Sequence, residues 1–127
     1  MFEDMAAPQL RAYPTYTVIA EKLEAIISLG MANSRMKDYF DLWVILRNTK
    51  HDPKILTAAL SATTNSRGTT TPQALPIGLT ERFGTDQQKV AQWNAFVKRN
   101  KLTAESLSET VKYLGNSLGF LFEAVKD

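Results

Sequence analysis

The sequence contains no cysteine and a single histidine, His51. The absence of cysteine excludes disulfide bonds, thiolate zinc sites and cysteine nucleophiles, and it agrees with a reducing compartment. One histidine in a polar turn supplies neither a Ser-His-Asp triad nor a multi-histidine metal site within one chain. The sequence therefore predicts no metal site of its own.

Long apolar runs and a strong net charge are also missing. No apolar run approaches the roughly 18 residues that span a membrane. The start, Met1 to Met5, is acidic and lacks the apolar core of a signal peptide. The formal net charge is only +2, which argues against a strongly basic nucleic-acid clamp. We expect a cytoplasmic protein without membrane contact.

The composition and the spacing of apolar residues predict one all-α domain spanning residues 1–127. The 127 residues are 44% hydrophobic and 22% charged, as in globular proteins large enough to bury a core. The apolar spacing predicts about five helices after an extended N-terminal segment. The expected elements are a helical pair over 15–48, a helix opening at Asp52-Pro53, a loop over 64–79, a helix after Thr85-Asp86 and a C-terminal helix over 103–126.

The C-terminal helix has the most regular pattern. Its apolar residues alternate at spacings of four and three: Leu107, Val111, Leu114, Leu118, Leu121 and Val125. A seam of this kind packs onto the domain's own core or pairs with a partner helix. Both interpretations stay open at this point.

Charged residues gather in the helical pair. Lys22 borders the apolar stripe of the first helix, while Asp38 and Asp41 lie three residues apart on the second. Arg35 precedes Asp38 by three residues and Lys37 precedes Asp41 by four, so local ion pairs are available. These charges form either a salt bridge between the two helices or a site that protrudes into a cleft. Spacing alone does not decide between the two.

Two segments of this pair carry a resemblance to a known family. Residues 20–25, Ala-Glu-Lys-Leu-Glu-Ala, and 35–42, Arg-Met-Lys-Asp-Tyr-Phe-Asp-Leu, resemble the C-terminal half of the AbiEii/AbiGii-type nucleotidyltransferase toxins. These toxins belong to bacterial abortive-infection (phage-defence) and type IV toxin–antitoxin systems. The similarity covers about residues 8–102 and is strongest over 13–46.

The resemblance implies a polymerase-beta-like catalytic lobe followed by a helical lobe. The helical lobe of that family supplies a lysine for the nucleotide phosphates and an Arg/Lys-Asp-x-x-Asp-Leu element. Lys22 matches the lysine, and Asp38 and Asp41 match the two aspartates. We therefore expect Asp38 and Asp41 as catalytic residues and Lys22 with Arg35 as nucleotide-binding residues. Charge neutralisation and positioning are the main requirements of such transfer reactions.

The sequence also departs from the family pattern. A Gly-Ser motif followed by Asp-x-Asp, which the resemblance implies for the metal and the nucleotide, does not occur in it. We therefore expect a truncated relative that is inactive alone, and the sequence predicts no definite cofactor for it. Mg²⁺, a nucleoside triphosphate, an RNA acceptor and an antitoxin protein are implied for the full-length family.

The alternative is a non-catalytic interaction or homodimerisation module. A helical lobe without its partner lobe leaves apolar area exposed, and such patches become interfaces. We expect a homodimer with contacts at Leu114, Leu118, Leu121 and Phe122. The basic residues Lys98, Arg99 and Lys101 either interact with the dipole of their helix or contact nucleic acid.

Overall fold

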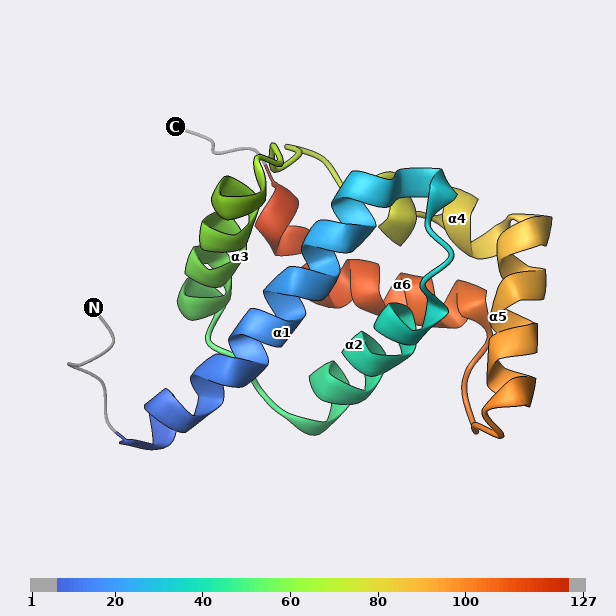
Figure 1. Cartoon of the computed structure of the whole chain (residues 1–127), viewed down its shortest axis with the longest axis horizontal. Helices are drawn as coiled ribbons and strands as arrows, with labels where there is room; N and C mark the ends of the chain where they lie inside the picture. The colour runs from blue at the N-terminus through green and yellow to red at the C-terminus, as the bar shows by residue number, and fades with distance from the viewer. Residues whose placement is uncertain (1–6, 124–127) are drawn as a thin grey trace.

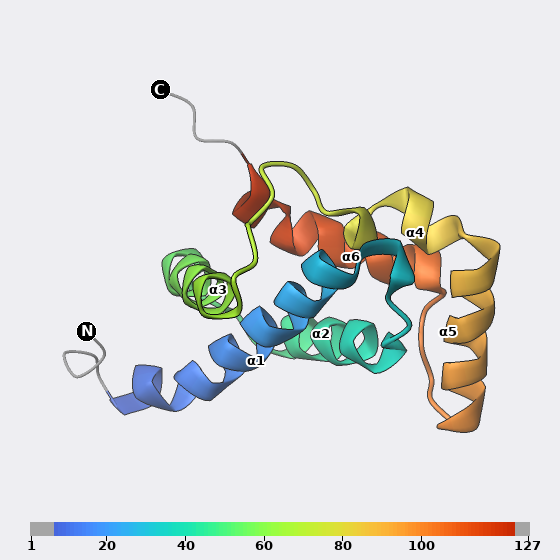
Figure 2. The same cartoon turned by 45° about the horizontal axis from the view of Figure 1, so that its top comes forward.

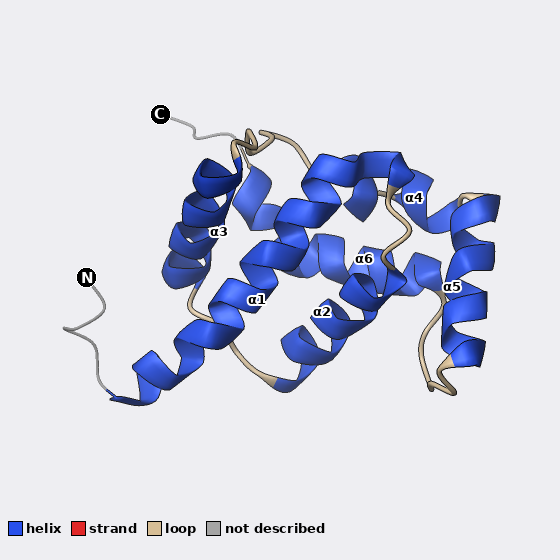
Figure 3. Cartoon of the chain, in the orientation of Figure 1, coloured by secondary structure: helices blue, strands red, loops and turns tan. Residues whose placement is uncertain are grey.

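The computed structural model describes the backbone of residues 7–123 and the side chains of residues 14–123. Over this range the chain is helical and contains no strand (Figure 3), which confirms the all-α class. The α-helices are α1 (Ala7–Leu29), α2 (Met36–Asn48), α3 (Pro53–Arg67), α4 (Glu81–Thr85), α5 (Gln87–Arg99) and α6 (Leu107–Leu118). Short 3₁₀ turns are η2 (Gly30–Ala32), η3 (Ile77–Leu79) and η4 (Gly119–Phe122). None of the described helices is both long and apolar enough to cross a membrane.

The helices pack in two layers, with α1 and α2 in the front layer and α6 in the layer behind it (Figure 1). Helices α1 and α2 cross in front of α6 in Figure 1, with α3 at one end of the molecule and α5 at the other. The turned view in Figure 2 keeps α3 and α5 at opposite ends. The core between the layers contains large side chains that are at most 2% exposed, including Ile26, Tyr39, Phe83, Trp93 and Phe122. This packing holds α1 and α2 side by side (Figures 1 and 2).

Tyr39 of α2 connects the front layer to the η3 turn through a hydrogen bond. Its hydroxyl donates a 2.8 Å hydrogen bond to the Gly78 carbonyl, and its ring stacks on Phe83 at 5.0 Å. Burial, followed by the nearby Asp38 charge, raises the pKa of Tyr39 well above its usual value. The phenol therefore stays neutral and remains a donor.

The expected extended N-terminal segment is wrong for residues 7–14, because α1 already begins at Ala7. Pro14 lies inside this helix, where it has no N–H for the carbonyl one turn earlier. The helix continues through this position, so one lost hydrogen bond is tolerated. Residues 1–6 lie outside the described range.

The loop expected over residues 64–79 begins later than predicted. Helix α3 runs to Arg67, and Gly68 follows in the left-handed conformation with φ 68°. The Thr69 N–H then donates to the Thr64 carbonyl at 2.9 Å, which closes the helix end. The loop is therefore limited to residues 68–76, between α3 and η3.

The C-terminal helix is shorter than the predicted range of 103–126. It starts after Ser106, which caps the helix because its hydroxyl accepts from the Glu109 N–H at 3.1 Å. It ends at Leu118, where Gly119 opens the η4 turn. Glycine weakens helix continuation, which explains the early end. Val125 lies outside the described residues.

The α6 seam is part of the domain's own core. Leu114 and Leu118 are fully buried, Phe122 is 2% exposed and Leu121 is half-buried. Leu114, Leu118 and Phe122 are therefore unavailable as dimer contacts, and the prediction that placed them in a dimer interface is wrong. The heptad spacing arose because α6 packs against neighbours of the same chain.

Candidate functional site

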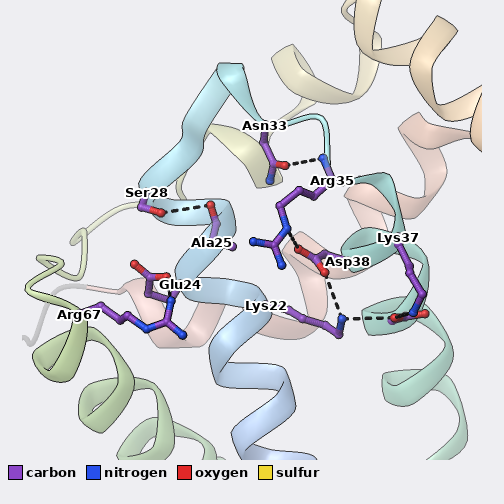
Figure 4. Close-up of polar contacts among 10 residues, drawn as sticks. Lys22, Glu24, Ala25, Ser28, Asn33, Arg35, Lys37, Asp38 and Arg67 are labelled. Carbon is purple, nitrogen blue, oxygen red and sulfur yellow. Dashed lines mark hydrogen bonds and ion pairs between the residues drawn. The ribbon is translucent and has the colours of Figure 1, made fainter.

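Lys22 on α1 points toward Asp38 of α2 (Figure 4), and its ammonium group also contacts Asp41 of the same helix. Its Nζ lies 3.1 Å from Asp38 Oδ1 and 3.2 Å from Asp41 Oδ2. The side chains of Lys22 and Asp38 are 18% and 6% exposed, so their contact is largely shielded from water. Lys22 and Asp38 are thus neighbours across the first two helices, as both interpretations of their charges require.

Arg35 and Lys37 supply one further cation to each aspartate. Arg35 Nε lies 2.8 Å from Asp38 Oδ2, and Lys37 Nζ lies 2.5 Å from Asp41 Oδ2. The hydrogen bond to Asp41, and then its charge, raise the pKa of Lys37. Three cations thus surround two carboxylates, and the cluster has one positive charge in excess. All four residues predicted for the site lie in it.

One buried residue, Asn33, in the turn between α1 and α2 positions Arg35. Asn33 is fully buried, and its Oδ1 accepts from the Arg35 N–H at 2.7 Å. The Asn33 carbonyl accepts from Lys89 Nζ of α5 at 2.9 Å, and Lys89 is only 4% exposed. Lys89 therefore anchors the turn from which α2 starts. Sequence reasoning missed both residues, because no local pattern links a turn asparagine to a lysine so far along the chain.

A cavity of about 310 Å³ opens beside the cluster on the α1 side. Its lining includes Lys22, Arg35 and Arg67, the last of which comes from the end of α3. Arg67 forms ion pairs with Glu21 and, at 3.4 Å, with the buried Glu24. Sequence reasoning missed Arg67, which is brought here because α3 packs along α1. The cavity is thus lined by three cations and one carboxylate, Glu21.

The carboxylates of the cluster do not by themselves fit a magnesium ion. Mg²⁺ requires several oxygen ligands, whereas Asp38 and Asp41 each already contact two cationic side chains. Within residues 14–123 no group of three His, Cys, Asp or Glu side chains is placed to hold a metal ion.

The fold and the cluster together define a helical domain that presents paired cations and carboxylates beside a basic cavity. A model of the AbiEii family, described as nucleotidyl transferase AbiEii toxin of type IV toxin–antitoxin systems, matches residues 1–114. The chain belongs to this family, as its resemblance in residues 20–25 and 35–42 indicates. Searches of curated proteins and of solved structures found no match.

Proposed function

We propose that the chain is the nucleotide-proximal helical lobe of an AbiEii-type nucleotidyltransferase. The observation that carries this proposal is Lys22, held between two aspartates at the edge of a cavity that Arg35 also lines. Transfer of a nucleotidyl group depends mostly on positioning and on neutralising phosphate charge. Lys22 and Arg35 bind the phosphates in this proposal.

The two aspartates keep these cations in place. Asp38 contacts both Lys22 and Arg35, so it fixes where their charges lie. Asp38 also orients the reacting group, and Asp41 supports Lys22 from the other side. A purely structural salt bridge is the competing explanation, and it predicts no response of the cluster to nucleotides.

We further propose that this chain alone does not transfer nucleotides. Its sequence has no Gly-Ser followed by Asp-x-Asp, so the carboxylates that hold the metal in the family pattern are missing. An antitoxin is the partner that membership of a type IV toxin–antitoxin family implies. An RNA acceptor is implied only by the sequence resemblance of residues 20–25 and 35–42. Homodimerisation through α6 loses three of its four expected contacts, since Leu114, Leu118 and Phe122 are buried in the chain's own core.

Calorimetric titration of the purified chain with ATP, CTP, GTP and UTP, each with Mg²⁺, tests the phosphate site. At least one triphosphate should bind saturably, and Lys22→Met should weaken it by about 10-fold, the value of one charge-assisted contact. Lys54→Met is the matched control, since Lys54 is exposed at the start of α3, at the opposite end from Arg67, and does not line the cavity. Absence of binding, or equal binding by Lys22→Met, would contradict the proposal.

A transfer assay with labelled triphosphates and total RNA tests the second part. The wild-type chain should incorporate no label. Incorporation that disappears in Lys22→Ala would show that the chain is active alone.

A further inference from the structure

Lys89 is a buried cation in the first turn of α5. It is 4% exposed, and the Asp86 carboxylate that caps the helix accepts from its backbone N–H at 3.0 Å. Among residues 14–123 its ammonium group forms no ion pair. The first turn of a helix favours negative charge, and a buried cation costs free energy unless a carboxylate compensates it. Two effects therefore oppose a lysine at this position.

The partners of this ammonium group are neutral. Its Nζ donates to the Asn33 carbonyl at 2.9 Å and, at 3.5 Å, to the amide oxygen of Gln92. It also lies 5.7 Å from the centre of the Phe83 ring, within reach of a cation–π contact. The bond to the Asn33 carbonyl is the shortest of the three and is buried. The charge of Lys89 therefore acts mainly on one carbonyl in the turn between α1 and α2.

Asn33 connects this bond with Arg35. Its carbonyl accepts from Lys89, while its side-chain Oδ1 accepts from the Arg35 N–H at 2.7 Å. Asn33 is fully buried, so water does not compete for either bond. A charge-assisted hydrogen bond is about twice as strong as a neutral one, so the bond from Lys89 is the stronger restraint. The first turn of α5 thus restrains the residue that precedes α2.

Arg35 depends on this restraint because few contacts hold its side chain. The side chain is 59% exposed, and its Nε lies 2.8 Å from Asp38 Oδ2. Packing therefore contributes little to the position of the guanidinium group, and the backbone position of residue 35 contributes more. Arg35 lines both the α1-side cavity and a larger cavity of about 660 Å³ between the start of α2 and the second half of α5. A misplacement of about 1 Å is sufficient to weaken the contacts of such a group.

We propose that Lys89 is a positioning residue that sets the affinity of the phosphate site by fixing Arg35 through Asn33. The inference rests on the proposed function, in which Lys22 and Arg35 bind the triphosphate. Lys89 touches no phosphate itself, since it does not line the α1-side cavity. A purely structural role is the competing explanation, and it predicts that any loss of affinity follows a loss of stability.

A double-mutant cycle of Lys89→Met and Arg35→Met separates the two explanations. Its readout is calorimetric titration with the triphosphate that binds best, in the presence of Mg²⁺. Lys89→Met alone should weaken binding about 3- to 10-fold, because its effect cannot exceed the loss of one charge-assisted contact. In the Arg35→Met background the same change should alter the affinity by less than about 2-fold, since the contact on which it acts is already lost.

Three further variants control for stability and for charge. Asn33→Ala keeps the carbonyl but removes Oδ1, so it should weaken binding as Lys89→Met does. Leu60→Ala truncates a buried residue of α3, which lies at the opposite end of the molecule from α5 (Figure 1), and it should bind triphosphate as the wild type does. Lys54→Met removes an exposed lysine and should leave the affinity unchanged in both backgrounds.

The ¹⁵Nε signal of the Arg35 side chain provides a readout that needs no ligand. In the wild type this nitrogen lies beside the Asp38 carboxylate. In Lys89→Met its NMR signal should move toward that of an exposed arginine such as Arg99, because the guanidinium group leaves this position. Loss of stability alone does not move the signal while the chain stays folded.

Three results would each overturn the inference: equal losses from Lys89→Met in both backgrounds, a loss in Leu60→Ala as large as that in Lys89→Met, or an Arg35 signal that stays in place. The two readouts also separate this inference from the proposed function. A wild-type chain that binds no triphosphate, but whose Arg35 signal moves in Lys89→Met, would contradict the proposed function and support the positioning of Arg35 by Lys89.

Discussion

Replacing Lys22 and Asp38 singly and together distinguishes a coupled ion pair from two independent charges. Lys22→Met keeps the length of the side chain without its charge, and Asp38→Asn keeps the shape of the carboxylate. In each single variant one charge stays buried, but it retains a second partner. Asp38 keeps Arg35 at 2.8 Å, and Lys22 keeps Asp41 at 3.2 Å.

The expected magnitudes follow from this arrangement. Breaking a buried pair outright costs about 3–5 kcal/mol. The retained partners should reduce the loss in the free energy of unfolding to about 1–3 kcal/mol for each single variant. The double variant leaves no uncompensated charge of this pair, so its loss should fall short of the sum by about 1–2 kcal/mol.

Urea unfolding monitored by tryptophan fluorescence measures all four free energies. Trp93 is 1% exposed and therefore reports the opening of the core. Additive losses, with a coupling energy below about 0.3 kcal/mol, would refute the claim that the two residues act as a pair. A pair of Lys54→Met with Asp38→Asn provides a control that should be additive, since Lys54 is exposed on α3.

Three further changes probe the scaffold. Gly78→Ala places a Cβ 2.7 Å from Ile26 Cγ2 and 2.8 Å from the Tyr39 hydroxyl, so the free energy of unfolding should fall by about 2–4 kcal/mol in urea unfolding. Lys89→Met removes the ammonium group that donates to the Asn33 carbonyl in the turn over residues 30–35. Amide exchange in this turn should therefore accelerate at least about 10-fold relative to α3. Burial lowers the pKa of His51 below 6.5, so the unfolded chain binds its proton first and stability should decline as the pH falls from about 7 through the folded-state pKa. His51→Gln should remove this part of the pH dependence in thermal melts, whereas an unchanged profile would exclude it.

The fold could be predicted where local patterns determine it. Apolar spacing and the proline after Asp52 were sufficient for α2, α5 and the start of α3, because those signals are local. The predicted helical pair begins at residue 15, whereas the structure starts α1 at Ala7 and continues it through Pro14, a residue without an N–H to donate. The end of α6 was missed because the heptad spacing runs beyond Gly119, where the backbone changes to a 3₁₀ turn.

The candidate site could be predicted only in its local part. Lys22, Asp38 and Asp41 lie in one helical pair, so their meeting follows from a single turn. Lys89 and Arg67 reach the same region from α5 and α3, and their positions depend on how whole helices pack. No periodicity within one helix contains that information.

The contact between a triphosphate and the Lys22 cluster is the central claim, and amide NMR spectra of the ¹⁵N-labelled chain test it most directly. Addition of the triphosphate that binds best, with Mg²⁺, should shift the amide signals of Lys22, Arg35 and Asp38 in a saturable way. Signals of α3 near Lys54 should stay in place, and Lys22→Met should abolish the shifts. Shifts that are absent, that spread evenly over the molecule, or that persist in Lys22→Met would contradict the claim and leave the cluster as a structural salt bridge.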